Sequence, residues 1–107
     1  MFVKVYEYHI QPEKIEEFFK VQEKAGEIYR KYLESHTIYL KKQDYGTKWM
    51  EISRYKDESE YKKSIELINE HEEIQHLFTD FQSLLVPGSE IVEEDFLQIE
   101  EKNSLGM

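Results

Sequence analysis

Apolar and polar residues alternate along four segments of the chain, a spacing that is typical of β-strands. The segments are residues 2–9 (FVKVYEYH), 36–42 (HTIYLKK), 48–55 (KWMEISRY) and 90–99 (EIVEEDFLQI). The second and third are joined by QDYGT, in which Gly46 supplies a turn, so this pair of segments predicts a β-hairpin.

Other segments repeat their apolar residues every three or four positions, the period of an α-helix. Between residues 13 and 34 the apolar side chains cover a broad arc, which predicts a helix covered by a sheet and by a second element. Asp57, with Glu60 three residues later, predicts the start of a second helix. A bend near residues 69–71 then leads into a third helix that ends near Leu85.

The elements follow one another as strand, helix, strand, strand, helix pair and strand. This order predicts an α+β domain with ferredoxin-like βαββαβ topology, in which an antiparallel sheet has its helices on one face. A chain of 107 residues is the right size for one domain, which we place at residues 1–99. We expect residues 100–107 to be a flexible C-terminal tail.

Alternate residues of a strand point to opposite faces of a sheet, so each predicted strand divides into two sets. The aliphatic set has no group that needs a hydrogen bond, and we expect it to face the helices. The other set mixes polar and aromatic residues and would lie on an open face. A sheet face with this much aromatic area is more typical of an interface than of a surface exposed to water. The aliphatic set is Val3, Val5, Ile38, Leu40, Met50 and Ile52, and the polar-aromatic set includes Tyr6, Tyr8, Tyr39, Trp49 and Glu51.

We therefore predict a homodimer in which the polar-aromatic faces of two sheets meet, so that the pair forms an α+β barrel. The alternative is a sheet that leaves this face in water, as antiparallel sheets often do.

Charge and composition exclude several classes of partner. The formal net charge of −9, without any cluster of Lys and Arg, argues against binding to nucleic acid. The longest apolar run has three residues (84–86), which is too short to cross a membrane, and charges interrupt residues 1–10, so we expect no signal peptide. These features predict a cytoplasmic protein. The chain has no cysteine, which excludes disulfides, thiolate catalysis and zinc sites built on sulfur.

The segment HEEIQHLF, residues 71–78, resembles a zinc-binding helix at first sight. In the zinc motif H-E-x-x-H the histidines are four residues apart and share one helix face. His71 and His76 are five apart, which separates them by about 140° around a regular helix, so we expect no metal there. We expect His71 to be a junction residue and His76 a solvated one. A metal site that also uses His9, His36 or distant carboxylates is the alternative.

Glu51 is the carboxylate with the most promising surroundings, because its position places it among the aromatic residues. Burial there would raise its pKa and could make it a proton acceptor near neutral pH. The alternative is a structural ion pair with Lys4 or Lys41 across the sheet.

The organisation of the chain resembles the antibiotic-biosynthesis monooxygenase family, whose members are dimeric α+β barrels of about this length. The most specific part is RYKDESEYKKSIELINEHEEIQHLFTDF: an aromatic strand end, an acidic cap, a helix, and two histidines followed by a phenylalanine. His71, His76 and Phe78 stand in those last roles. The chain departs from the family pattern at Gln75 and Leu77, where the family often has Pro and Phe.

The resemblance implies a cofactor-independent monooxygenase that acts on a small aromatic molecule. Haem-degrading relatives use an Asn on the first strand and a Trp on a helix, whereas this chain has tyrosines on the first strand and its Trp on the third, so we expect neither haem nor another cofactor. The alternative is a non-catalytic module for small-molecule binding or assembly. The candidate catalytic residues are His71, His76 and Glu51, and the candidate substrate-binding residues are Trp49, Tyr6 and Tyr39.

Overall fold

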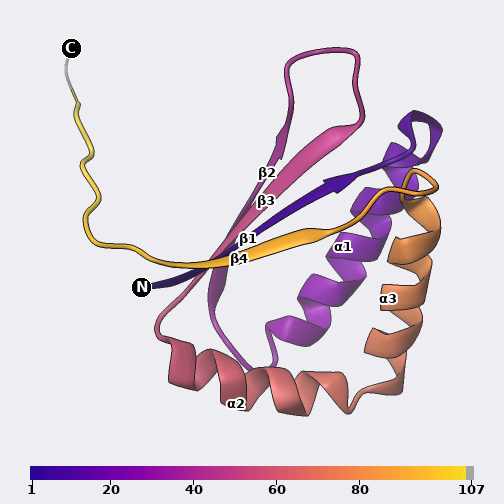
Figure 1. Cartoon of the computed structure of the whole chain (residues 1–107). Helices are drawn as coiled ribbons and strands as arrows, with labels where there is room; N and C mark the ends of the chain where they lie inside the picture. Colours follow the sequence, from indigo (N-terminus) through magenta and orange to yellow (C-terminus); the bar gives the residue numbers. More distant parts are fainter. Residues whose placement is uncertain (106–107) are drawn as a thin grey trace.

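Four strands form one antiparallel sheet in the computed structural model, which describes residues 1–105 (Figure 1). The strands lie in the order β2-β3-β1-β4, so the first and third strands occupy the centre of the sheet. The elements are β1 (Phe2–His9), the 3-10 helix η1 (Pro12–Lys14), α1 (Ile15–Tyr29), β2 (Ser35–Lys41), β3 (Lys48–Tyr55), α2 (Glu58–Asn69), α3 (Glu72–Leu84) and β4 (Val92–Leu97). The predicted ferredoxin-like βαββαβ fold is confirmed.

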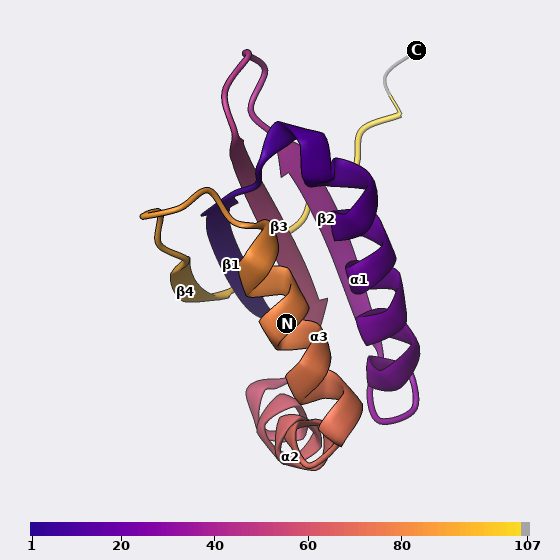
Figure 2. The ribbon, with the colours of Figure 1, turned by 90° about the vertical axis from the view of Figure 1, so that its right-hand side faces the viewer.

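The helices lie on one face of the sheet. Figure 2 shows α1 and α3 side by side in front of the strands, with α2 across one end of the layer. The predicted cap of α2 is confirmed, because the Asp57 side chain accepts a hydrogen bond of 2.7 Å from the backbone N–H of Glu60. None of the helices within residues 1–105 is both long enough and apolar enough to span a membrane.

Two element ends differ from the prediction. Helix α1 ends at Tyr29, although the apolar period continues to Leu33, because residues 30–32 form a turn that still directs Leu33 into the core. Residues 98–105 form no helix or strand, and residues 106–107 of the expected tail lie outside the described residues. The division into a domain at 1–99 and a flexible tail stays a prediction.

The face of the sheet that contacts the helices is the opposite of the predicted one. Tyr8, Trp49 and Tyr55 are no more than 7% exposed, and they pack in the core with residues from the helices. Ile38 and Leu40, which we expected under the helices, are 41% and 47% exposed. The polar-aromatic side is thus buried within the subunit, so our prediction that this side forms a dimer interface is wrong.

The physical reason is that ring area outweighs the cost of burying a few polar atoms. An aromatic side chain brings more apolar surface to a core than a valine or isoleucine does, and its hydroxyl is tolerated when it finds a partner. Tyr8 donates to Glu51 at 2.7 Å, and Tyr39 donates to Gln22 of α1 at 3.2 Å. The prediction treated the hydroxyls as a reason for exposure, whereas the fold supplies them with acceptors.

The core consists of two clusters at opposite ends of the sheet. The registers Phe2↔Tyr55 and Tyr8↔Trp49 place one aromatic pair at each end of the β1–β3 ladder. Between them lie the more polar pairs Lys4↔Ser53 and Tyr6↔Glu51. The first cluster is Phe2, Ile28, Leu33, Tyr55, Ile68 and Leu77, and the second is Tyr8, Ile10, Phe18, Trp49 and Leu84.

Substitutions of the neighbouring residues Ile68 and Leu67 on α2 test this description of the core. Ile68 is fully buried and Leu67 is 50% exposed. Ile68→Ala should lower the free energy of unfolding by about 2–5 kcal/mol, because it leaves a cavity. Leu67→Ala should lower it by less than about 1 kcal/mol, since only helix propensity and partial burial change. Urea unfolding followed by circular dichroism measures both, and equal effects would contradict this description of the core.

Candidate functional site

A cleft of about 470 Å³ opens between the helix-facing side of the sheet and helices α1 and α3. It lies where the sheet carries the polar pair Tyr6↔Glu51, between the two core clusters. Four tyrosines from β1, α1 and β3 line it, together with two phenylalanines from α3. These aromatic residues are Tyr6, Tyr8, Tyr29, Tyr55, Phe78 and Phe81.

The polar groups of the cleft come from both layers. Gln22 of α1 and Asn69 of α2 contribute amides, while Glu51 of β3 and Glu93 of β4 contribute carboxylates. In the sheet, Tyr6 pairs with Glu51 on one side and with Glu93 on the other. The strand register therefore sets a tyrosine ring between two carboxylates.

Glu51 is the most perturbed acid of the cleft. Burial raises the pKa of its carboxyl group, and the hydrogen bond from the Tyr8 hydroxyl partly opposes that rise. Within residues 1–105 it forms no ion pair: Lys4 contacts Glu93 and Asp95, and Lys41 donates to the backbone oxygen of Asp44. The alternative in which Glu51 pairs with Lys4 or Lys41 is therefore wrong.

The tyrosines of the cleft remain protonated over the ordinary pH range. Burial raises the pKa of Tyr6, Tyr8 and Tyr29 far above the usual tyrosine value, and for Tyr8 the negative charge of Glu51 adds to the effect. Each hydroxyl is thus a neutral group that can donate a hydrogen bond into the cleft or to a neighbour.

Aromatic packing fixes the wall of the cleft. The Tyr8 ring meets Phe81 edge to face, with centroids 5.1 Å apart and planes at 86°. Phe18 lies behind them, with its centroid 5.1 Å from that of Trp49 and 5.8 Å from that of Tyr39. The Tyr8–Phe81 and Phe18–Tyr39 pairs are edge to face, and the Phe18–Trp49 pair is tilted, so these ring contacts favour particular ring orientations.

The predicted site residues divide into three groups. Tyr6 and Glu51 line the cleft. Tyr39 and Trp49 stand behind its wall, since Tyr39 donates to the cleft residue Gln22 and both rings pack on Phe18. His71 and His76 form the third group, and neither is among the described residues that line the cleft.

His71 and His76 occupy different surroundings. His71 is the N-cap residue of α3, and its ring forms a hydrogen bond with the Tyr32 hydroxyl. His76 is exposed on the same helix. Across residues 1–105, no group of three or more His, Asp or Glu side chains is positioned to hold a metal ion.

Sequence reasoning missed Tyr8, Tyr29 and Phe81 as cleft residues. Tyr29 and Phe81 belong to the apolar stripes of α1 and α3, which we assigned only to the core. A signal was present, because both stripes include aromatic residues, and Tyr8 belongs to the same strand face as Tyr6. Phe78, which carried part of the family resemblance, also lines the cleft.

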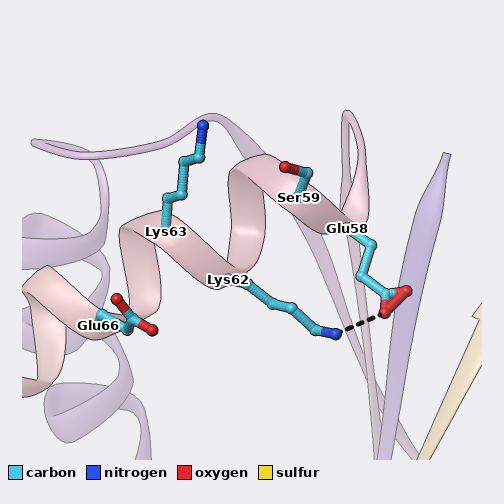
Figure 3. Close-up of a pocket in the computed structure, with 5 residues that line it drawn as sticks. All are labelled: Glu58, Ser59, Lys62, Lys63 and Glu66. Atoms are coloured by element: carbon cyan, nitrogen blue, oxygen red, sulfur yellow. Dashed lines mark ion pairs between the residues drawn. The ribbon is translucent and has the colours of Figure 1, made fainter.

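A second hollow, of about 460 Å³, lies along the surface of α2 (Figure 3). Its lining residues all come from that one helix, and an ion pair of 3.1 Å joins Lys62 to Glu58. This hollow is lined by charged side chains and a serine, without the aromatic rings that line the cleft. We therefore regard the aromatic cleft as the candidate site.

Three solved structures show the same arrangement of strands and helices. A mutant of SnoaB, a cofactor-independent oxygenase from Streptomyces nogalater, superimposes with a TM-score of 0.72 at 12% identity, covering 94% of each chain. A putative antibiotic biosynthesis monooxygenase from Nitrosomonas europaea gives 0.68 at 12% identity and covers 94% of this chain and 100% of the other. An uncharacterized NIPSNAP domain protein from Burkholderia xenovorans gives 0.67 at 18% identity, over 95% and 100%.

The chain has the fold of antibiotic-biosynthesis monooxygenase-like and NIPSNAP proteins. The predicted resemblance is thereby confirmed at the level of the fold. Neither a protein-family model nor a curated protein matches this chain. At identities of 12–18%, the likeness to these monooxygenase-like structures carries no assignment of residues or substrate.

The raised pKa of Glu51 predicts how stability depends on pH. Between the ordinary glutamate pKa and the raised pKa, the folded protein binds more protons than the unfolded chain, so the free energy of unfolding falls as pH rises. Glu51→Gln removes this contribution and still accepts from Tyr8. The variant should therefore gain stability relative to the parent protein as pH rises through this window.

Urea unfolding at a series of pH values measures that difference. Glu16→Gln, at an exposed position of α1, is the matched control and should give no such trend. A difference that stays flat for Glu51→Gln, or that falls with pH, would show that Glu51 is not destabilised by burial.

Proposed function

We propose that this protein is a small cofactor-independent monooxygenase-like enzyme that binds a flat aromatic molecule in the cleft. The observation that carries the proposal is the position of Glu51, a carboxyl group with a raised pKa in the wall of an aromatic cleft. Perturbed acids in clefts are typical of functional sites. The shared fold with a cofactor-independent oxygenase supports the same reaction class.

The cleft suits a small ligand in size and in chemistry. Its volume of about 470 Å³ lies within the range that is usual for small-molecule sites. Tyrosine and phenylalanine rings can stack on a flat substrate, while a few hydrogen-bonding groups orient it. Among the residues predicted to bind substrate, we assign direct contact to Tyr6, and we assign support of the wall to Tyr39 and Trp49.

The proposed chemistry needs only the substrate and dioxygen. Glu51 takes a proton from an activated methylene or phenol of the substrate, and the resulting anion transfers electrons to dioxygen. In the overall reaction a CH₂ group and O₂ become C=O and water, so the substrate itself is the reductant. A carboxylate whose pKa is raised toward neutrality is a stronger base than an ordinary one.

His71 and His76 have no step in this proposal. Both stay predictions as catalytic residues, derived from the resemblance and not from contact with the cleft. The cytoplasmic location expected from the sequence likewise stays a prediction.

Oxygen uptake tests the reaction. With a panel of flat aromatic compounds that carry a phenol or an activated methylene, the protein should consume oxygen when a substrate is present. Glu51→Gln should slow turnover by about 10²- to 10⁴-fold, since proton transfer by a positioned base is worth that much. Ligand affinity should change little, because the cleft keeps its aromatic walls. Glu16→Gln should retain full activity, and uptake that is unaffected by Glu51→Gln would refute the role of Glu51.

We also propose that the protein is a homodimer formed through the aliphatic face of the sheet. This face bears no helix, and its side chains include Ile38, Leu40, Val92 and Phe96, each between 41% and 47% exposed. An apolar sheet face of this extent is a poor surface for a monomer. The dimer implied by the family resemblance is kept, but its interface is the face opposite to the one predicted.

A charge placed on that face tests the dimer. Ile38→Glu should shift the protein from twice the 13.0 kDa of one chain to a monomer, because a carboxylate cannot be buried there without a partner. Leu67→Glu, at an exposed position of α2, should leave the assembly unchanged. Sedimentation velocity measures both masses, and a parent protein that sediments as a monomer at micromolar concentration would contradict the proposal.

The competing function is a non-catalytic module that binds a small molecule or assembles with itself. It predicts ligand binding without oxygen uptake, or a dimer without any ligand. The cleft weighs against pure assembly, because it has apolar walls and hydrogen-bonding groups and belongs to the helix-facing side of the sheet rather than to the open side.

A further inference from the structure

The charges around the cleft all have one sign. Two of its lining residues, Glu51 and Glu93, are acidic, and within residues 1–105 no lysine, arginine or histidine lines it. The formal net charge of −9 adds a negative field over the whole molecule. A ligand that carries a carboxylate or phosphate would therefore meet repulsion without any compensating partner.

The nearest cation is already occupied. The ammonium group of Lys4 lies 2.6 Å from Glu93 and 2.6 Å from Asp95. It also lies 5.3–5.9 Å from the ring centroids of Phe2, Tyr6 and Tyr61. One ammonium thus faces two carboxylates, and the group keeps a net negative charge beside the cleft.

The two acids occupy different depths. Burial raises the pKa of Glu51, whereas the Glu93 side chain is 52% exposed and so lies at the solvent side of the cleft. Both residues flank Tyr6 in the sheet, and two strand spacings separate their backbones by about 10 Å. A phenol ring with a two-carbon arm could therefore place its hydroxyl near one acid and the end of its arm near the other.

We propose that the cleft selects aromatic amines: the ring lies on Tyr6 with its hydroxyl toward Glu51, and the ammonium group lies at the mouth beside Glu93. The inference rests on the proposed function, because it assumes that the cleft binds a flat aromatic molecule. To the proposed function, the inference adds the charge of the substrate and the residue that recognises this charge.

Three probes that differ only at the end of the arm test the inference. They are tyramine, para-propylphenol and para-hydroxyphenylpropionate, whose arms end in an ammonium, a methyl group and a carboxylate. Isothermal titration calorimetry at low ionic strength should give tyramine an affinity about 2- to 5-fold higher than that of para-propylphenol, the effect of one partly exposed charge pair. The carboxylate probe should bind more weakly than either.

Two variants on neighbouring residues of β4 locate the effect. Glu93→Gln should reduce the preference for tyramine over para-propylphenol to less than about 2-fold, while Lys4 keeps Asp95 as its partner. Glu94→Gln is the matched control, because the same charge is removed from the opposite face of the same strand. It should leave the preference unchanged.

The outcomes separate the two proposals. If para-propylphenol binds as tightly as tyramine, the inference is overturned while the aromatic cleft stands. If both variants reduce the preference equally, the selectivity comes from the general field and Glu93 is not the site. If none of the three probes binds the unaltered protein, the proposed function fails together with the inference.

Discussion

The interlocking of aromatic rings between the sheet and the helices is the interaction on which the rest of the structure depends. Phe18 has no exposed surface, and its ring contacts those of Tyr8, Tyr39, Trp49 and Phe81, which come from β1, β2, β3 and α3. Phe18 therefore fixes α1 against the sheet and against α3. The two apolar clusters lie at the ends of the β1–β3 ladder, and the cleft opens at the Tyr6↔Glu51 pair between them.

The same arrangement explains why an acid can lie in the wall. Glu51 is held in a largely apolar setting by strands that are already stabilised at both ends, so the cost of its burial does not prevent folding. Sites that hold a group in an unfavourable environment depend on this kind of surrounding support. The Tyr8 hydroxyl lessens the cost without removing it, which leaves the carboxyl group available as a proton acceptor.

The order and type of the elements could be predicted from the sequence, because periodicity, the Asp57 cap and the Gly46 turn each act locally. The face of the sheet that meets the helices could not. Both sets of side chains are compatible with burial, and the choice between them depends on whether the tyrosine hydroxyls find acceptors. Gln22 and Glu51 supply these acceptors in the folded chain.

Glu51 and Tyr6 were selected as site residues because the strand pattern places them among aromatic residues. That reason still holds, although the face they share contacts the helices instead of a second subunit. The histidines were selected for their spacing in the sequence. Their positions outside the cleft are set by the path of α3, which the spacing does not reveal.

Strand β4 supplies one wall of the cleft but joins the sheet across a long stretch of chain, since Lys4 and Asp95 are 91 positions apart. Contacts of such separation slow folding, because a long stretch of chain must close before they form. Until β4 emerges from the ribosome, one edge of β1 has unpaired backbone groups on a nascent chain, and such an edge can pair with a foreign strand. The acidic residues of β4 therefore have a second consequence: once β4 covers β1, the new edge of the sheet carries negative charges that oppose pairing with a foreign strand.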